Sequence, residues 1–283
     1  MSTRILLECV LSLGLCVAAA SAQSPSPKTG YAPVNGIRMY YEIHGDKGDV
    51  LVLIHGGGST IGTSFGRILP LLATDFRVVA VETQAHGHTT DRNAPESFEQ
   101  DADDVAALMR YLKISKASIF GFSNGGNDAM QIALRHPELV DKLVLASSFY
   151  KREGMIPGFF DGMKQATLDV MPRILKEAFL KINPDTTKLM AMFTKDRGRM
   201  MRFSDWSDDA LRSINAPTLI INGDRDVVLA SHAAAMAGLI PQSRLMILPA
   251  THGEYIGVAE GPDPGSKVIE LVSGIVKDFL RKQ

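Results

Sequence analysis

Cysteine is almost absent from this chain of 283 residues, and its absence excludes several kinds of chemistry. Both cysteines, Cys9 and Cys16, lie within the first 22 residues. If that segment is removed, the remaining chain has no thiol. A thiolate nucleophile, a thiolate metal site and a disulfide scaffold are then excluded, and the fold must be stabilised by its core alone.

An excess of charge of either sign is also lacking. The 30 lysines and arginines nearly balance the 31 aspartates and glutamates, which gives a formal net charge of -1. Nucleic acid is not an expected partner, because nucleic-acid-binding proteins usually carry a clear basic surplus. The composition, with 45% hydrophobic and 22% charged residues, is that of an ordinary globular protein with one large domain or a domain and an insertion.

The N-terminal segment 1–22 has the pattern of a secretory signal peptide. Arg4 supplies a positive start, 5–20 is mostly apolar, and Ala20-Ser21-Ala22 is a cleavage site of the small-x-small type. A retained membrane anchor is the alternative, but the apolar stretch is short for a membrane span. We expect export to the periplasm or the medium, no stable membrane association after cleavage, and a Pro-rich tether over 23–35.

Short apolar runs recur along the remaining chain and alternate with segments of helix length. The run 50–54 (VLVLI) is apolar throughout, as in a strand that is buried on both faces of a parallel sheet. This alternation predicts a doubly wound, mostly parallel α/β sheet. The predicted strands are 37–43, 50–54, 77–81, 117–122, 142–146, 218–221 and 244–248, and the predicted helices are 65–73, 100–112, 127–135, 231–239 and 266–280.

The segment 150–206 interrupts the alternation, because it contains no run typical of a buried strand. We therefore expect a core formed by 36–149 and 207–283, with an inserted helical cap between the two parts. Methionine is concentrated in the insertion, and its flexible side chain suits an adaptable apolar surface. We expect most of these methionines to pack the insertion's own core and a minority to line an apolar pocket. They are Met155, Met163, Met171, Met190, Met192, Met200 and Met201.

A glycine-flanked serine stands between a predicted strand and a predicted helix. The sequence Gly121-Phe122-Ser123-Asn124-Gly125 ends the strand 117–122 and precedes the helix 127–135. On such a turn the serine hydroxyl projects from the end of the sheet, and the close packing of strand and helix requires small residues two positions before and after it. A flexible glycine–serine loop is the alternative, but the flanking elements favour a nucleophile.

A serine hydroxyl becomes a good nucleophile only when a base removes its proton and a third group orients that base. An acid follows the predicted strand 218–221, and a histidine follows the predicted strand 244–248. The acid is Asp226 or its neighbour Asp224, and the histidine is His252. Ser123, the acid and His252 would all lie at the carboxyl ends of parallel strands, where sheets of this class bind their ligands.

Together these motifs resemble those of the α/β-hydrolase superfamily, in particular its lid-bearing serine esterases. The resemblance covers nearly the whole chain after the first 22 residues. It implies that Ser123 is the nucleophile, that His252 is its base, and that Asp226 rather than Asp224 orients the histidine. The chain differs from the family pattern at Glu82, where an aspartate is usual.

The tetrahedral intermediate of such a reaction needs hydrogen-bond donors for its oxyanion. The loop His55-Gly56-Gly57-Gly58 follows the strand 50–54 and resembles the H-G-G-G oxyanion loop of lipases and esterases. The resemblance implies that the backbone N–H groups of Gly57 and Asn124 are the donors, with Gly58 as the second choice in the loop.

The sequence therefore predicts an exported serine hydrolase that cleaves a carboxylic ester of a small, largely apolar substrate through an acyl-enzyme. It predicts no cofactor and no metal, and it specifies no oligomeric state. The same three residues would also suit a lactone, an amide or a carbon–carbon bond. A relative that binds a ligand without turnover is the rival from another class.

Overall fold

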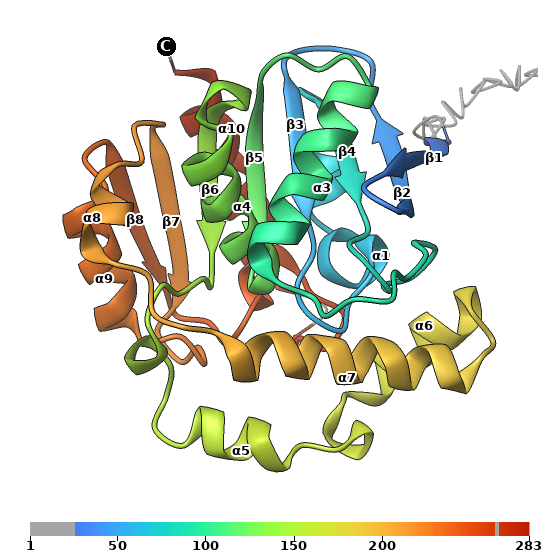
Figure 1. Ribbon diagram of the computed structural model, residues 1–283. Coiled ribbons are helices and arrows are strands. Elements are labelled where there is room, and N and C mark those ends of the chain that lie inside the picture. The colour runs from blue at the N-terminus through green and yellow to red at the C-terminus, as the bar shows by residue number, and fades with distance from the viewer. Residues whose placement is uncertain (1–25, 264–265, 283) are drawn as a thin grey trace, which may run out of the picture.

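The computed structural model describes residues 26–263 and 266–282 (Figure 1). The predicted signal peptide, 1–22, lies outside the described residues. Within the described residues, no helix is both long enough and apolar enough to span a membrane.

The centre of the fold is one sheet of eight strands in the order β1-β2-β4-β3-β5-β6-β7-β8. β1 pairs with β2 and β2 with β4 in antiparallel fashion, and all further neighbours are parallel. The expected doubly wound, mostly parallel sheet is confirmed. The strands are β1 (Lys28–Val34), β2 (Ile37–His44), β3 (Val50–Ile54), β4 (Arg77–Val81), β5 (Ala117–Phe122), β6 (Val140–Ala146), β7 (Thr218–Gly223) and β8 (Ser243–Leu248).

The predicted tether is wrong over most of its length, because Lys28–Val34 forms β1. This strand pairs with β2 across a tight turn at Asn35 and Gly36, both of which have positive φ angles, 42° and 87°. Asn-Gly is the dipeptide that such two-residue hairpins favour. The alternating burial of Ala32 and Val34 fixes β1 to the sheet.

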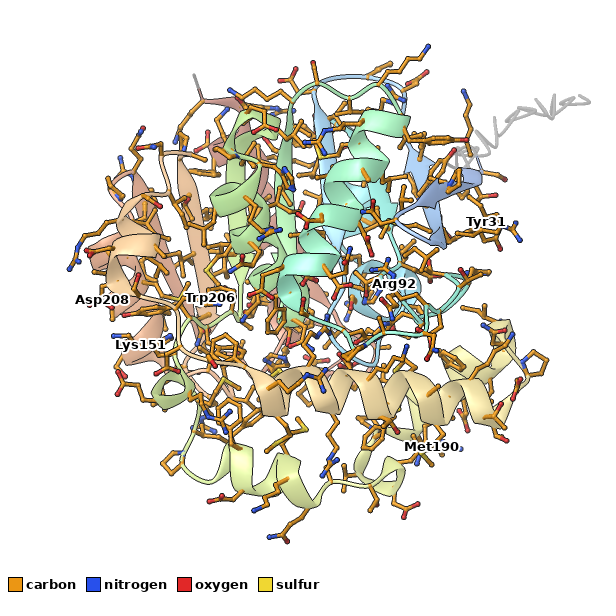
Figure 2. All side chains as sticks on the ribbon, viewed as in Figure 1. Tyr31, Arg92, Lys151, Met190, Trp206 and Asp208 are labelled. Carbon is orange, nitrogen blue, oxygen red and sulfur yellow. The ribbon has the colours of Figure 1, made fainter. Side chains whose placement is uncertain are left out.

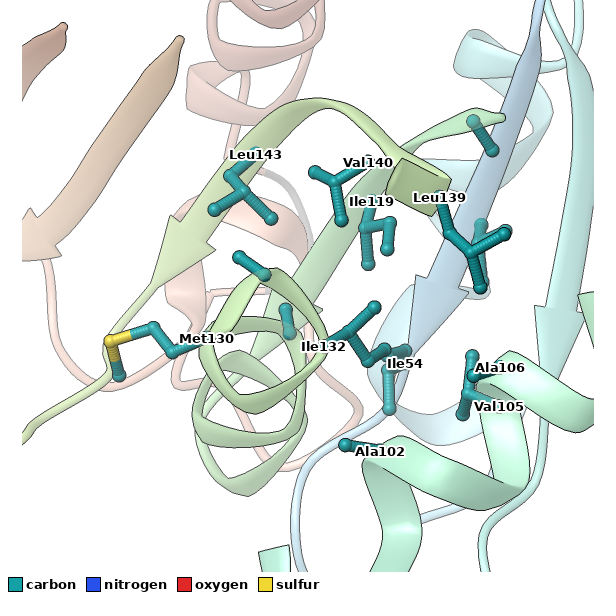
Figure 3. Packing of buried hydrophobic residues seen from close by; sticks show 14 of the residues in the cluster. Ile54, Ala102, Val105, Ala106, Ile119, Met130, Ile132, Leu139, Val140 and Leu143 are labelled. Carbon is teal, nitrogen blue, oxygen red and sulfur yellow. The ribbon is translucent and has the colours of Figure 1, made fainter. Parts of the chain in front are cut away.

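Helices cover both faces of the sheet (Figure 1). One core cluster joins the strands to α3, α4 and α9, and the other joins them to α1, α2 and α10. Figure 3 shows part of the first cluster, where Ile132 of α4 and Val105 of α3 lie near Ile54 and Ile119 of the sheet. The core helices are α1 (Ile61–Phe65), α2 (Leu69–Leu72), α3 (Phe98–Tyr111), α4 (Asn124–Arg135), α9 (Ala230–Leu239) and α10 (Val268–Arg281).

The predicted helix 65–73 is correct only over 69–72, which forms α2, because a turn at 66–68 separates this helix from α1. α1 begins earlier, at a capping box formed by Thr60 and Thr63, and ends at Phe65, with Gly66 as its C-cap. α2 then begins anew with Pro70 in its first turn. Proline lacks a backbone N–H and is readily accommodated only in the first turn of a helix, so it starts a second helix here.

The chain between β6 and β7 forms helices that stand over one end of the sheet. They are α5 (Phe159–Gln165), α6 (Arg173–Ile182) and α7 (Thr186–Arg202), whereas α8 (Asp208–Arg212), just before β7, packs beside α9 (Figure 1). α7 crosses the end of the sheet at which the parallel strands terminate, and α5 lies beyond it (Figure 1). The insertion leaves and rejoins the core at adjacent points. The backbone N–H of Trp206 donates to the carbonyl of Tyr150 (2.9 Å), and Lys151 forms an ion pair with Asp208 (2.8 Å; Figure 2).

Candidate active site

Ser123 lies on a strained turn between β5 and α4. Its φ and ψ angles are 53° and -122°, and its N–H donates to the carbonyl of Ala146 at 2.8 Å. A Cβ atom on Gly121 would lie 2.0 Å from the carbonyl oxygen of Gly125, and one on Gly125 would lie 2.2 Å from that of Ile54. Strand, helix and neighbouring strand are therefore too close for any side chain at either glycine.

The structure brings Ser123, His252 and Asp226 together in one chain of hydrogen-bonding contacts. His252 Nε2 lies 3.1 Å from Ser123 Oγ, and His252 Nδ1 lies 2.7 Å from Asp226 Oδ1. Asp224 instead accepts a hydrogen bond from the backbone N–H of Ala250 at 3.0 Å, so it holds the loop that carries the histidine. Of the two candidate acids, only Asp226 contacts His252.

Ser147 contacts Asp226, and Tyr255 contacts Ser147 in turn; no sequence motif indicated either residue. Ser147, which follows β6, donates its hydroxyl proton to Asp226 Oδ2 at 2.5 Å. Ser147 Oγ also lies 2.6 Å from the hydroxyl of Tyr255, which donates to the carbonyl of Ile221 at 3.2 Å. The position of Ser147 at the carboxyl end of a core strand was a signal that could have identified it.

These contacts keep the carboxylate ionised. Although burial alone would raise the pKa of Asp226, hydrogen bonds from His252, Ser147 and the N–H of Val228 lower it below its ordinary value. A carboxylate that is ionised and fixed in this way can hold the imidazole in one orientation and stabilise its protonated form.

The two candidate N–H groups of the glycine loop after β3 differ in whether they are already hydrogen-bonded. The N–H of Gly58 donates to His86 Nε2 at 3.2 Å. The N–H groups of Gly57 and Asn124 have no hydrogen-bond partner within the described residues, and both residues line the cavity described below. This arrangement favours Gly57 over Gly58 as the donor from the loop.

His55 and His86 support this loop from beneath. His55 Nε2 accepts the N–H of Thr83 at 3.1 Å, and burial lowers the pKa of His55 to about 3, so its ring is neutral. His86 Nδ1 lies 2.8 Å from the carbonyl of Gln84, which requires a proton on Nδ1. Burial opposes protonation of His86, while the carboxylate of Asp196, 3.5 Å from Nε2, raises its pKa. The contact of His86 Nε2 with the N–H of Gly58, at 3.2 Å, is shorter than its contact with Asp196. Nε2 therefore accepts a hydrogen bond from Gly58, and the ring of His86 is neutral.

A cavity of about 550 Å³ opens between Ser123 and the helical insertion. Its walls are mostly apolar. The expectation that only a minority of the insertion's methionines would line a pocket is wrong, because five of the seven do. They are Met155, Met163, Met171, Met192 and Met200. The other two, Met190 and Met201, do not line it, and Met190 is exposed on α7 (Figure 2).

No candidate metal centre accompanies this site in the described part of the chain. Among residues 26–263 and 266–282, no group of three or more histidine, cysteine, aspartate or glutamate side chains is arranged to hold a metal ion.

Comparison with known proteins assigns the family. The model of the alpha/beta hydrolase fold family matches residues 49–256, and the chain belongs to this family. It is 27% identical to the putative carbamate hydrolase RutD of Rhizobium rhizogenes over 224 residues, which cover 70% of this chain and 83% of the relative. It is 34% identical to the serine hydrolase BPHL of Homo sapiens over 130 residues, 44% of this chain and 45% of the relative. The meta-cleavage product hydrolase of Pseudomonas fluorescens IP01 has the same fold, with a TM-score of 0.71 at 24% identity, over 89% of this chain and 96% of that one.

The first prediction concerns the contact between the turn and the sheet. Gly121→Ala should lower the free energy of unfolding by about 3 kcal/mol, because the new Cβ meets backbone rather than a movable side chain. Urea unfolding measures the change. Gly274→Ala on α10 is the matched control, since a Cβ there meets no atom within 4 Å. It should be neutral or stabilise the protein by up to about 1 kcal/mol. Equal effects of the two substitutions would contradict the prediction.

The second prediction concerns Ser147. Ser147→Ala removes a hydrogen bond to an ionised carboxylate and should slow the modification of Ser123 by a fluorophosphonate about tenfold. Ser148→Ala is the matched control, because the neighbouring hydroxyl is also buried but has no hydrogen-bond partner in the described structure. The control should react at the wild-type rate. A Ser147→Ala protein that reacts as fast as the control would show that Asp226 does not depend on this contact.

Proposed function

We propose that the chain is an exported serine hydrolase that cleaves a carboxylic ester of a small, largely apolar substrate through an acyl-enzyme. The observation that carries this proposal is the chain of contacts from Ser123 Oγ to His252 (3.1 Å) and from His252 to Asp226 (2.7 Å) beside an apolar cavity. Two relatives, a serine hydrolase and a putative carbamate hydrolase, support hydrolysis as the type of reaction.

In the first half of the reaction, Ser123 Oγ attacks the ester carbonyl while His252 Nε2 takes its proton. Asp226 holds Nδ1 and stabilises the imidazolium that forms. The carbonyl oxygen becomes negative and is bound by the N–H groups of Gly57 and Asn124. Loss of one such donor typically costs about 3–4 kcal/mol of transition-state stabilisation. His252 then protonates the departing alcohol, which leaves the acyl group on Ser123.

In the second half, His252 removes a proton from a water molecule that attacks the acyl-enzyme. The same two N–H groups bind the second oxyanion, and His252 returns its proton to Ser123 Oγ as the carboxylic acid leaves. The volume of the cavity, about 550 Å³, is within the range of sites for small organic molecules. Its methionine and phenylalanine walls suit a largely apolar substrate.

A fluorophosphonate tests this function directly, because it modifies serines that a neighbouring base activates. We expect a single adduct, on Ser123 by peptide mapping, which is absent in Ser123→Ala and strongly reduced in His252→Ala. A native protein that remains unlabelled would refute the proposed function.

Export is a separate part of the proposal and rests on the pattern of the first 22 residues. If the signal is cleaved after Ala22, the protein recovered from the periplasm or the medium should begin at Gln23, as measured by intact mass. A mature protein that still begins at Met1 would contradict cleavage and favour a retained anchor.

A further inference from the structure

One carboxylate lies in the wall of the otherwise apolar cavity. It belongs to Asp196 of α7 and is the only acidic side chain among the described residues that line this space. The side chain is 12% exposed, so it is largely removed from bulk water but still open to the cavity. A charged group in such a place is costly unless it has a partner, and it therefore needs an explanation.

The carboxylate lies directly beside the glycine loop and the nucleophile turn. Its Oδ1 accepts hydrogen bonds from the side chain of Asn124 (Nδ2, 3.1 Å) and from Arg199. A Cβ atom on Gly57 would lie 2.6 Å from its Oδ2. Asp196 therefore contacts both segments that supply the proposed oxyanion donors.

Oδ2 is less well satisfied than Oδ1. Its polar neighbour is His86 Nε2 at 3.5 Å, which is long for a hydrogen bond, and that nitrogen also faces the N–H of Gly58 at 3.2 Å. A carboxylate oxygen has two lone pairs, so Oδ2 retains acceptor capacity. This capacity is available at the cavity wall beside Gly57.

A buried cluster keeps Asp196 charged and in position. Arg199 is 2% exposed and pairs with Asp196 and, at 2.5 Å, with Asp101. Burial opposes ionisation of Asp196, but the guanidinium of Arg199 lowers its pKa well below the ordinary value. The carboxylate is thus ionised at neutral pH. Because Arg199 also pairs with Asp101, its charge is shared and does not fully cancel that of Asp196.

The one arginine on the described cavity wall, Arg197, is directed elsewhere. Its guanidinium donates to the backbone carbonyl of Met163 at 2.8 Å and to that of Lys164. It is therefore held against the backbone of the insertion beside α5. The charge nearest to Gly57 and Asn124 on the cavity side is that of Asp196.

We infer that Asp196 is a specificity-determining residue that accepts a hydrogen bond from an ammonium or hydroxyl group on the acyl part of the substrate. This inference rests on the proposed function. A carbonyl oxygen bound at the N–H of Gly57 places the first atoms of the acyl group near Oδ2. A donor two or three bonds from the carbonyl carbon can then reach the carboxylate, and a cationic donor forms the strongest hydrogen bond with it. An anionic acyl group is repelled by the same charge.

The test uses p-nitrophenyl esters of three acids of equal length: 3-aminopropanoate, 3-hydroxypropanoate and butanoate. Each kcat/KM is divided by the rate of the uncatalysed hydrolysis of the same ester. The wild-type protein should prefer the amino ester to the butanoate by at least about tenfold, with the hydroxy ester between them, because a site with a fixed acceptor discriminates strongly against an analogue without the donor. Asp196→Asn should reduce the ratio of amino ester to butanoate at least about tenfold.

Asp161→Asn is the matched control, because it removes the same charge from an exposed position on α5 that does not line the cavity. It should keep the wild-type ratio. Labelling of Ser123 by a fluorophosphonate shows that each variant is folded. If Asp196→Asn does not fold, the kcat/KM ratios of the wild-type protein for the three esters alone decide whether the inference holds.

The outcomes separate the inference from the proposed function. A wild-type protein that hydrolyses butanoate as well as the amino ester, or better, overturns the role of Asp196 while the hydrolase function stands. An Asp196→Asn variant with an unchanged ratio of amino ester to butanoate also overturns the role of Asp196 and leaves the hydrolase function standing. A wild-type protein that hydrolyses none of the three esters and is not labelled at Ser123 overturns the proposed function itself.

Discussion

The close approach of α4 to the sheet is the constraint on which the rest of the site depends. Gly121 and Gly125 leave no room for a Cβ atom, so β5 must turn into α4 within a single residue. That residue, Ser123, is held at a φ angle of 53°. The strain is tolerated because the packing on both sides determines it, and its result is a hydroxyl that projects from the end of the sheet. The proposed attack on a substrate and the proposed proton transfer to His252 both require that position.

The parallel sheet then brings distant parts of the chain to this hydroxyl. The loops after β3, β5, β6, β7 and β8 all leave the sheet at the same end, and they carry Gly57, Ser123, Ser147, Asp226 and His252. No two of these residues need to be near in sequence, because adjacent parallel strands set their separation in space. The α7 helix closes this end from outside and adds Asp196, which core loops alone would not supply.

Much of this arrangement could be predicted because its signals are local. A glycine-flanked serine between a strand and a helix, and an acid and a histidine after later strands, are readable from short segments, and the structure brings the three side chains together. The place of Ser147 after a core strand was readable, but its contact with Asp226, like the contacts of Asp196, could not be predicted, since such contacts depend on which side chains face one another across the sheet end and the insertion. The strand β1 was missed for a different reason: its Asn35-Gly36 turn was a local signal, but the prolines nearby suggested a tether instead.

The position of Asp196 implies an electrostatic repulsion during the proposed reaction that a suitable substrate can offset. An ionised carboxylate beside Gly57 and Asn124 opposes the negative charge that develops on the carbonyl oxygen, and Arg199, which is shared with Asp101, offsets this only in part. A substrate without a donor experiences that opposition throughout the reaction. A substrate with an ammonium group places a positive charge between the carboxylate and the oxyanion, and its attraction to the oxyanion grows as the oxyanion forms. The proposed selectivity would therefore arise in the transition state and be expressed in the chemical step, beyond any difference in initial binding.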